Sequence, residues 1–300
     1  MTYSAGNSMA RRTDHAGRTG RVRRGRAIRG LVIVAMLVPG ACKLDTVVFS
    51  GNAVDAYTLP ATLIPDSLRR EVTFTSGGET LHGFWIRQPG SAPRLSVVYS
   101  HGKGENLSRD IEWTHAEFLW QCGFDVLTYD YRGFGRSTGT SEDELTLIAD
   151  AKAALAFALT QPGVTLGRVV SYAHSLGSAP GIAVASATPG LRALIVESGF
   201  STGQAMAESA NPLGMPVSWL LRQPMLNTER IAKVTAPVLV MHGDADILIP
   251  VAQGRELYAA AHEPRQLRIV AGAGHDQVQK VMGLPAFSAL MRSFTNAAVP

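Results

Sequence analysis

Short apolar runs alternate with longer helical patterns along most of this 300-residue chain. The runs have the length of buried strands, and the segments between them repeat apolar residues at the spacing of a helix. Strands are expected at 95–100, 124–130, 168–173, 191–198, 237–242 and 266–270, and helices at 107–122, 143–160, 175–187, 251–261 and near the C-terminus. Strands joined by helices form right-handed βαβ units. The sequence therefore predicts an α/β fold with a mostly parallel sheet and helices on both faces.

An antiparallel hairpin is expected before the first parallel strand. The segments REVTFTS and ETLHGFWIR flank Gly77 and Gly78, and a glycine pair between two strand-forming runs is typical of a tight turn. In the helix at 107–122, an apolar stripe through Leu107, Ile111, Phe118 and Cys122 is expected to face the sheet.

The first 41 residues differ in charge from the rest of the chain. They hold eight arginines and one acidic residue, Asp14, whereas the remaining residues hold 20 basic and 23 acidic ones. An arginine-rich stretch precedes the apolar run at 31–38 and the small pair Gly40-Ala41, an order typical of a secretory signal. The run is far shorter than the ~20 residues that span a bilayer. Residues 1–41 are expected to be an export signal, with a basic arm that contacts nucleic acid as the alternative.

Cys42 directly follows this pattern and resembles the cysteine of a bacterial lipobox, although Pro39 stands where an aliphatic or small residue is usual. The resemblance implies a lipid anchor on Cys42 and a protein of the cell envelope, bound to the membrane; a secreted protein is the alternative. Cys122 is expected to be a small buried side chain. The cysteines show no metal-ligand spacing, and no metal site is expected.

Four expected strands end in polar or glycine-rich segments. In parallel sheets, functional groups gather just beyond the carboxyl ends of the strands. The strands lead into Ser175 within YAHSLGSA, and into SHGKGEN, HGDADILIP and AGAGHDQV. A serine in a sharp strand-to-helix turn, an acid and His275 follow in the chain order of one class of serine hydrolase. The glycines after the strand at 95–100 favour backbone N–H groups that face an oxyanion.

The chain resembles the α/β-hydrolases and, within them, the short-capped, bud-emergence-type serine hydrolases. The resemblance runs from about Glu71 to the last helix and rests on LHGFWI, YSHGKGENLS, YDYRGFGRSTG, YAHSLGSA, LIVESGFST, HGDADILIP and GAGH. It implies one hydrolase domain over residues 42–300, a short helical cap at 199–232 and a Ser-His-Asp mechanism. One position departs from the family pattern, because Ala173 stands where glycine usually begins the turn around the nucleophile.

Each site residue then receives an expected role. Ser175 is the nucleophile and His275 the general base; the alternatives are a helix-capping serine and a surface histidine. The family spacing selects Asp246 as the acid that orients His275, with Asp244 and Glu197 as competitors.

The oxyanion that forms during the reaction needs two donors. The backbone N–H of Leu176 is the first, because it follows the nucleophile and starts a helix. By resemblance, the N–H of Lys103 is the second. His101 and His242 each precede a glycine and are expected to brace loops.

The expected reaction is hydrolysis of a carboxylic ester through Ser175, without a metal or organic cofactor and without a nucleic-acid partner; thioesters stay open. Apolar residues in the cap favour a substrate with an apolar group of short to medium length, although ordinary packing explains them equally well. They are Met206, Met215, Trp219, Leu220, Leu221 and Met225. The alternatives are a serine peptidase and a non-catalytic envelope lipoprotein on the same fold.

Overall fold

The computed structural model describes residues 44–92, 94–104, 106–209 and 223–297. An eight-stranded sheet forms its centre, in the order β1-β2-β4-β3-β5-β6-β7-β8. The strands are β1 (Arg69–Ser76), β2 (Glu79–Ile86), β3 (Ser96–Ser100), β4 (Asp125–Tyr129), β5 (Val169–His174), β6 (Ala193–Glu197), β7 (Val238–Gly243) and β8 (Arg265–Val270). β1 and β2 form the expected antiparallel hairpin, β2 runs antiparallel to β4, and the other neighbours are parallel. The predicted α/β fold is confirmed.

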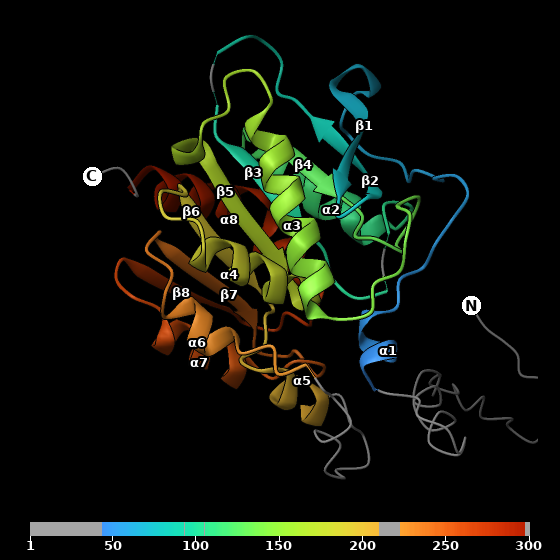
Figure 1. Cartoon of the computed structure of the whole chain (residues 1–300). Helices are drawn as coiled ribbons and strands as arrows, with labels where there is room; N and C mark the ends of the chain where they lie inside the picture. Colours follow the sequence, from blue (N-terminus) through green and yellow to red (C-terminus); the bar gives the residue numbers. More distant parts are fainter. Residues whose placement is uncertain (1–43, 93, 105, 210–222, 298–300) are drawn as a thin grey trace, which may run out of the picture. The chain divides into compact units, whose positions relative to one another are not determined.

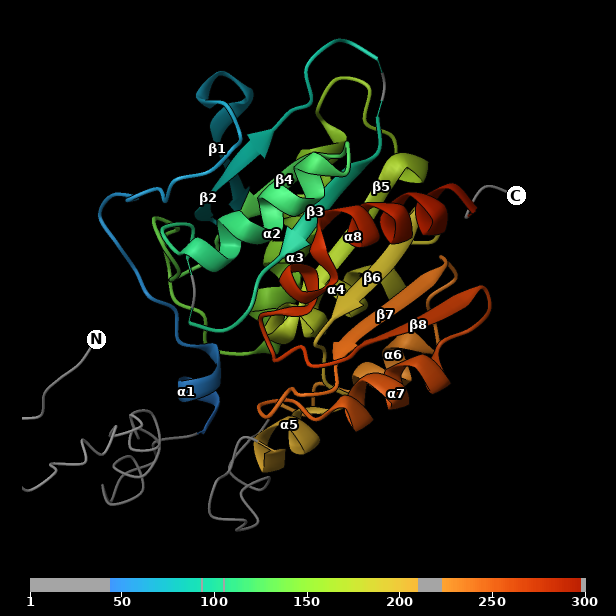
Figure 2. The same cartoon turned by 180° about the vertical axis from the view of Figure 1, so that it is seen from behind.

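Helices cover both faces of this sheet, and each face has its own apolar core. In Figure 1, α3 (Glu144–Leu159) and α4 (Ser178–Ser186) lie in front of the sheet, with α6 (Asn227–Ile231) and α7 (Val251–Ala260) packed beside them. From behind, α2 (Asp110–Gln121) and α8 (Val278–Ala297) cover the other face (Figure 2). Every residue of the central strands β3 to β7 is buried, as continuous apolar runs predict.

The buried face of α2 differs from the prediction. Its buried residues are Glu112, Trp113, His115, Ala116 and Leu119, whereas the predicted Ile111 and Phe118 are only partly buried. Two of the residues that α2 turns toward the sheet are therefore polar. The burial predicted for Cys122 is confirmed.

Short elements complete the fold: the helices α1 (Leu44–Phe49) and α5 (Gly203–Ser209), and the 3-10 turns η2 (Asp66–Leu68), η3 (Leu166–Arg168) and η4 (Ser175–Gly177). The helix expected at 175–187 thus begins as η4 and continues as α4. Within the described ranges, no helix has both the length and the apolar composition needed to cross a membrane.

The segment expected to form a cap, 199–232, contains α5 and α6. Met225 is fully buried in the core and Met206 packs against it, so the described apolar residues of this segment contribute to packing. Met215, Trp219, Leu220 and Leu221 lie outside the described residues, as do the expected export signal and Cys42.

Candidate active site

Ser175 occupies the sharp turn between β5 and η4. Its φ is 52°, in the left-handed region that non-glycine residues rarely adopt, and such strain persists only where the surrounding structure enforces it. A Cβ on Gly177 would lie 2.1 Å from the carbonyl oxygen of Ser100 and 2.7 Å from that of His101. Only glycine therefore lets the turn pass this close to the end of β3.

Ala173, the departure from the family pattern, faces a second glycine. A Cβ on Gly181 of α4 would lie 2.6 Å from the Ala173 Cβ. Gly181 thus leaves room for the Ala173 methyl group where α4 crosses β5. The methyl group of Ala173 therefore fits in this crossing because the helix position that faces it is glycine.

His275 links Ser175 to an acid. Its Nε2 lies 2.8 Å from Ser175 Oγ, and its Nδ1 lies 2.7 Å from Asp246 Oδ2. An ionised carboxylate only accepts hydrogen bonds, so Nδ1–H donates to Asp246 and Nε2 accepts from the serine hydroxyl. The structure brings the three predicted residues together from the ends of β5, β7 and β8.

The Asp246 carboxylate is held on both oxygens. Oδ1 accepts hydrogen bonds of 2.9 Å from the backbone N–H groups of Leu248 and Ile249, and Oδ2 lies 3.3 Å from His242 Nε2. Burial alone would raise the pKa of Asp246, but the hydrogen bonds from His242 and His275 hold this pKa well below its ordinary value. Asp246 therefore stays ionised beside His275.

The two competing acids have other partners. Asp244 is exposed, and its Oδ1 accepts a 2.7 Å hydrogen bond from the Gly272 N–H, which ties the loop after β7 to the loop after β8. Glu197 lies at the end of β6, where its Oε2 accepts from the hydroxyl of Tyr172 and from Gln279 Nε2. Asp246 is the acid whose carboxylate contacts His275.

The histidines at 101 and 242 brace loops, as predicted. His242 Nε2–H donates to the Ile249 carbonyl at 2.8 Å, and His101 Nδ1 lies 2.8 Å from the Gly102 carbonyl. Burial lowers the pKa of His101 to about 4, so this side chain is neutral.

Ser198 was not identified from the sequence. It follows Glu197 with φ 50°, and its hydroxyl donates a 2.8 Å hydrogen bond to the backbone carbonyl of His275. The contact fixes the loop that carries His275. The sequence shows a serine at the end of a predicted strand, but this feature is too common to indicate such a role.

The segment that contains Lys103 runs beside Ser175. A Cβ on Gly102 would lie 3.4 Å from Ser175 Cβ and 3.3 Å from His174 Nδ1. Leu176 is the second residue of η4, where backbone N–H groups have no partner within the helix. Both expected oxyanion donors therefore belong to backbone next to Ser175.

Apolar side chains lie at the surface next to the acid. Ile247 is 95% exposed and Leu248 44% exposed, and both belong to the loop that Asp246 organises through its backbone contacts. The sequence prediction placed the apolar surface in the cap and missed this one.

Comparisons with known proteins show what the chain is similar to. A family model described as serine aminopeptidase, S33, matches residues 91–229. An uncharacterized protein of Mycobacterium tuberculosis is 30% identical over 277 residues, which cover 90% of this chain and 97% of that protein. An alpha/beta hydrolase domain-containing protein of Caenorhabditis elegans is 30% identical over 189 residues, or 62% of this chain and 53% of that protein.

The fold also matches solved structures. An esterase of Pyrococcus furiosus superposes with a TM-score of 0.64 and 19% identity, and the match covers 82% of this chain and all of that one. At this identity, the likeness shows a shared fold.

Proposed function

The chain belongs to the α/β-hydrolase superfamily, and we propose that it hydrolyses carboxylic esters by acyl transfer through Ser175. The contacts that run from Asp246 through His275 to Ser175 carry this proposal. These contacts link a serine at a strained turn, a histidine and a carboxylate in the hydrogen-bonded order that such a reaction requires. We assign these three roles to Ser175, His275 and Asp246.

Acylation begins at the Ser175 hydroxyl. Its oxygen attacks the ester carbonyl carbon while His275 Nε2 takes the proton, and Asp246 stabilises the imidazolium that forms. The C–O bond of the ester then breaks, and the alcohol leaves with the proton from Nε2. Water repeats the sequence on the acyl-enzyme: His275 takes its proton, the acid is released, and Ser175 regains its hydrogen.

The negative charge on the carbonyl oxygen needs donors in both tetrahedral intermediates. We assign this role to the backbone N–H groups of Leu176 and Lys103, because both belong to backbone beside Ser175. A single donor of this kind contributes about 2.7–4 kcal/mol to transition-state stabilisation. Removal of either N–H by rearrangement of its loop is expected to lower kcat far more than it raises KM.

An apolar acyl group fits the surroundings of the site. Ile247 and Leu248 expose apolar surface next to Asp246, whereas Met225 of the cap is committed to the core. Each buried CH₂ adds about 0.8 kcal/mol only as long as the chain stays in contact with the protein. Esters of short to medium acyl chains are therefore expected to be the preferred substrates, and thioesters share the same chemistry.

A panel of aryl esters with graded acyl length, run beside aminoacyl amides, tests this function. The ester proposal predicts faster ester turnover with an optimum at short or medium length. Faster amide turnover would favour a peptidase. Labelling of Ser175 by a fluorophosphonate, with Ser175→Ala as control, separates an enzyme from a non-catalytic binding protein on the same fold.

Within the superfamily, we assign the chain to the short-capped, bud-emergence-type group on the motifs between LHGFWI and GAGH. We also propose export to the cell envelope and a lipid anchor on Cys42. The sequence pattern before Cys42 supports this, and α1 begins two residues later. The Asp45 carboxylate of α1 accepts a 3.3 Å hydrogen bond from the Gln223 N–H, so an anchor there would hold this end of the cap segment near the bilayer.

Fractionation and intact-mass analysis of the protein, made in a bacterium that processes lipoproteins, test the anchor. Lipid on Cys42 and recovery with membranes are expected, and Cys42→Ser is expected to release the protein or block its processing. Cleavage at another residue, or an unprocessed chain, would contradict the proposal.

A further inference from the structure

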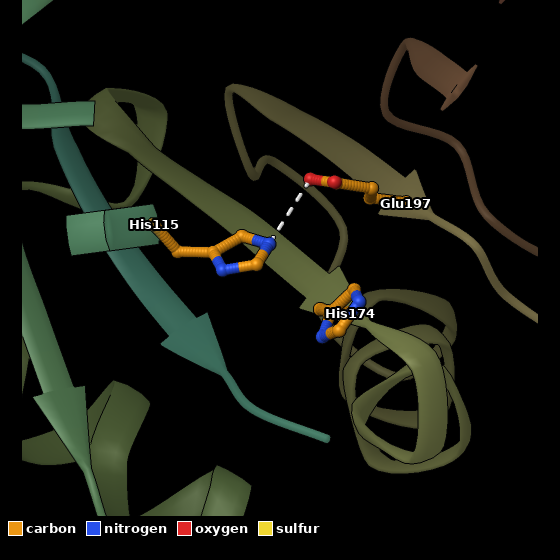
Figure 3. A group of neighbouring side chains, drawn as sticks. All are labelled: His115, His174 and Glu197. Carbon is orange, nitrogen blue, oxygen red and sulfur yellow. Dashed lines mark ion pairs between the residues drawn. The ribbon is translucent and has the colours of Figure 1, made fainter. Parts of the chain in front are cut away.

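A group of buried side chains with electron-donating atoms lies behind the nucleophile, separate from the triad. It consists of His115 from α2, His174 at the end of β5 and Glu197 at the end of β6 (Figure 3). His174 and Glu197 are register partners in the parallel pair of β5 and β6. The exposed fractions of the three residues are 1%, 2% and 0%.

Several atoms of this group have no hydrogen-bond partner among the described residues. They are His115 Nε2, both ring nitrogens of His174, and Glu197 Oε1. Buried polar atoms in folded proteins are nearly always paired, and an unpaired one destabilises the fold. His115 Nε2 and His174 Nε2 each have a carboxylate oxygen nearby, on Glu197 at 3.5 Å and on Asp276 at 3.4 Å. His174 Nδ1 and Glu197 Oε1 have no such neighbour in the described part of the chain, and they indicate that a further group completes the cluster.

The hydrogen bonding of His115 indicates that the missing group is positively charged. His115 Nδ1 lies 2.9 Å from the Ile111 carbonyl oxygen, and a carbonyl only accepts hydrogen bonds, so Nδ1 carries a proton. The ring stacks on Tyr99 with centroids 5.3 Å apart. Nε2 then points at Glu197 Oε2, 3.5 Å away (Figure 3). A nitrogen lone pair and a carboxylate repel each other at this distance unless a cation lies between or beside them.

Further contacts hold these side chains in place. The Tyr172 hydroxyl and Gln279 Nε2 both donate to Glu197 Oε2, which leaves Oε1 unpaired. In metal sites, the second nitrogen of a ligating histidine typically donates to a backbone carbonyl, and ligating carboxylates are themselves hydrogen-bonded. His115 and Glu197 have both kinds of contact.

We propose that His115, His174 and Glu197 form a structural metal site, with Zn²⁺ as the best-matched ion. One ligand atom from each residue lies within 4.8 Å of the other two. In a tetrahedral zinc site with bonds of about 2.1 Å, the ligand atoms lie about 3.4 Å apart. The three side chains would therefore need only small rotations to bring their ligand atoms to this separation. Two imidazoles and a carboxylate are a three-ligand set used for this ion, in which a water molecule takes the fourth position. The site joins α2, β5 and β6 directly behind Ser175 and takes no part in the transfer of protons or acyl groups.

A proton is the competing occupant. Burial opposes charge on His115, but the neighbouring Glu197 carboxylate raises the pKa of His115 to about 9, so without a metal ion the two residues form a buried ion pair. A second group, His174, His275 and Asp276, also has ligand atoms within 4.8 Å. An ion in that group would occupy the base His275 and inhibit the enzyme.

The full mature chain, produced in zinc-supplemented medium and purified without chelator or metal-affinity steps, is the sample for the test. Elemental analysis is expected to find about one zinc ion per chain that survives dialysis. A strong chelator is expected to lower Tm, and added Zn²⁺ to restore it. Replacement by Co²⁺ is expected to give visible absorption bands of a tetrahedral site.

Two variants locate the ion. Glu197→Gln keeps the shape of the side chain and is expected to lose the zinc. Asp276→Asn removes a carboxylate that belongs to the second group and lies 3.4 Å from His174 Nε2 without being a ligand of the first group, and it is expected to keep the zinc. If Glu197→Gln fails to fold, His115→Gln is the second variant, and it is also expected to lose the zinc.

Two results would overturn the proposal. If the wild-type protein is purified without metal and its Tm does not change when Zn²⁺ is added, the ion pair is favoured. Zinc that is lost from Asp276→Asn but kept by Glu197→Gln overturns it in favour of the second group. Metal content and Tm do not depend on ester hydrolysis, so these results stand apart from the proposed activity.

Discussion

Two buried carboxylates end neighbouring strands of this sheet and have opposite surroundings. Asp246 follows β7, where two backbone N–H groups and two histidines contact its oxygens. Glu197 ends β6, where one oxygen accepts two hydrogen bonds and the other has none among the described residues. Full pairing fixes Asp246 as a stable anion beside His275. Incomplete pairing leaves Glu197 with the capacity to hold a cation.

The histidines that face these two carboxylates differ in exposure and in position. The His275 side chain is 12% exposed, on a loop after β8 where it contacts Ser175, and the proposed function requires it to exchange protons with a substrate. His115 lies within α2 under the sheet, and its side chain is 2% exposed. We therefore assign different tasks to the two groups: the proposed triad carries the chemistry, and the His115–His174–Glu197 cluster supports the turn that holds Ser175.

The largest expected effect comes from Asp246→Asn. Asparagine keeps the shape of the side chain but favours the wrong tautomer of His275, a change that costs about 10⁴ in kcat in a serine protease. We expect a comparable fall in ester turnover with an unchanged circular dichroism spectrum. A kcat within tenfold of wild type would remove Asp246 from the triad.

Glu197→Gln is expected to show the reverse pattern. Whether the cluster holds a metal ion or a proton, the change leaves His115 and His174 without the buried charge they face, and breaking such a pair costs about 3–5 kcal/mol. Urea unfolding is expected to show this loss, while kcat of the folded fraction changes much less than in Asp246→Asn. A collapse of kcat with stability unchanged would make Glu197 the triad acid.

Sequence patterns located the strands well because the central ones are buried on both faces and read as continuous apolar runs. They pointed to Ser175 because it follows such a run. His275 instead follows β8, an edge strand with alternating burial, and its glycine-rich loop and its place in the chain order singled it out. The choice between Asp244 and Asp246 rested on family spacing, since both lie on one loop; the structure adds the contact with His275.

The cluster of His115, His174 and Glu197 could not be predicted from the sequence. The apolar periodicity of α2 predicted a face through Ile111 and Phe118, while the helix in fact buries Glu112 and His115. A pattern built on apolar residues cannot reveal a face that buries polar ones. His174 and Glu197 meet through strand register, and Gly181 makes room for Ala173 only where α4 crosses β5. These relations belong to tertiary packing.

Gly181→Ala tests the turn that the two sides share. The added methyl group would lie 2.6 Å from the Ala173 Cβ, and overpacking of this kind costs about 1–3 kcal/mol. Tm is expected to fall, and kcat to fall with it as Ser175 shifts. Ala173→Gly in the same chain is expected to restore most of both, because it returns the missing space. Additive losses in the double variant would show that the two positions do not share one space.

The smallest effect is expected from Asp244→Asn, the matched control for Asp246→Asn. Asp244 lies two residues before Asp246 on the same loop, but it is exposed, and the Gly272 N–H is the partner of its carboxylate among the described hydrogen bonds. The asparagine carbonyl oxygen accepts the same hydrogen bond, so only its charge is lost. A surface hydrogen bond of this kind contributes about 0.5–1.5 kcal/mol, and kcat is expected to stay within about threefold of wild type. Steady-state kinetics of both variants, measured side by side on one short-chain aryl ester, decide the assignment: if Asp244→Asn shows the larger fall, Asp244 orients His275 during turnover and the loop rearranges when substrate binds.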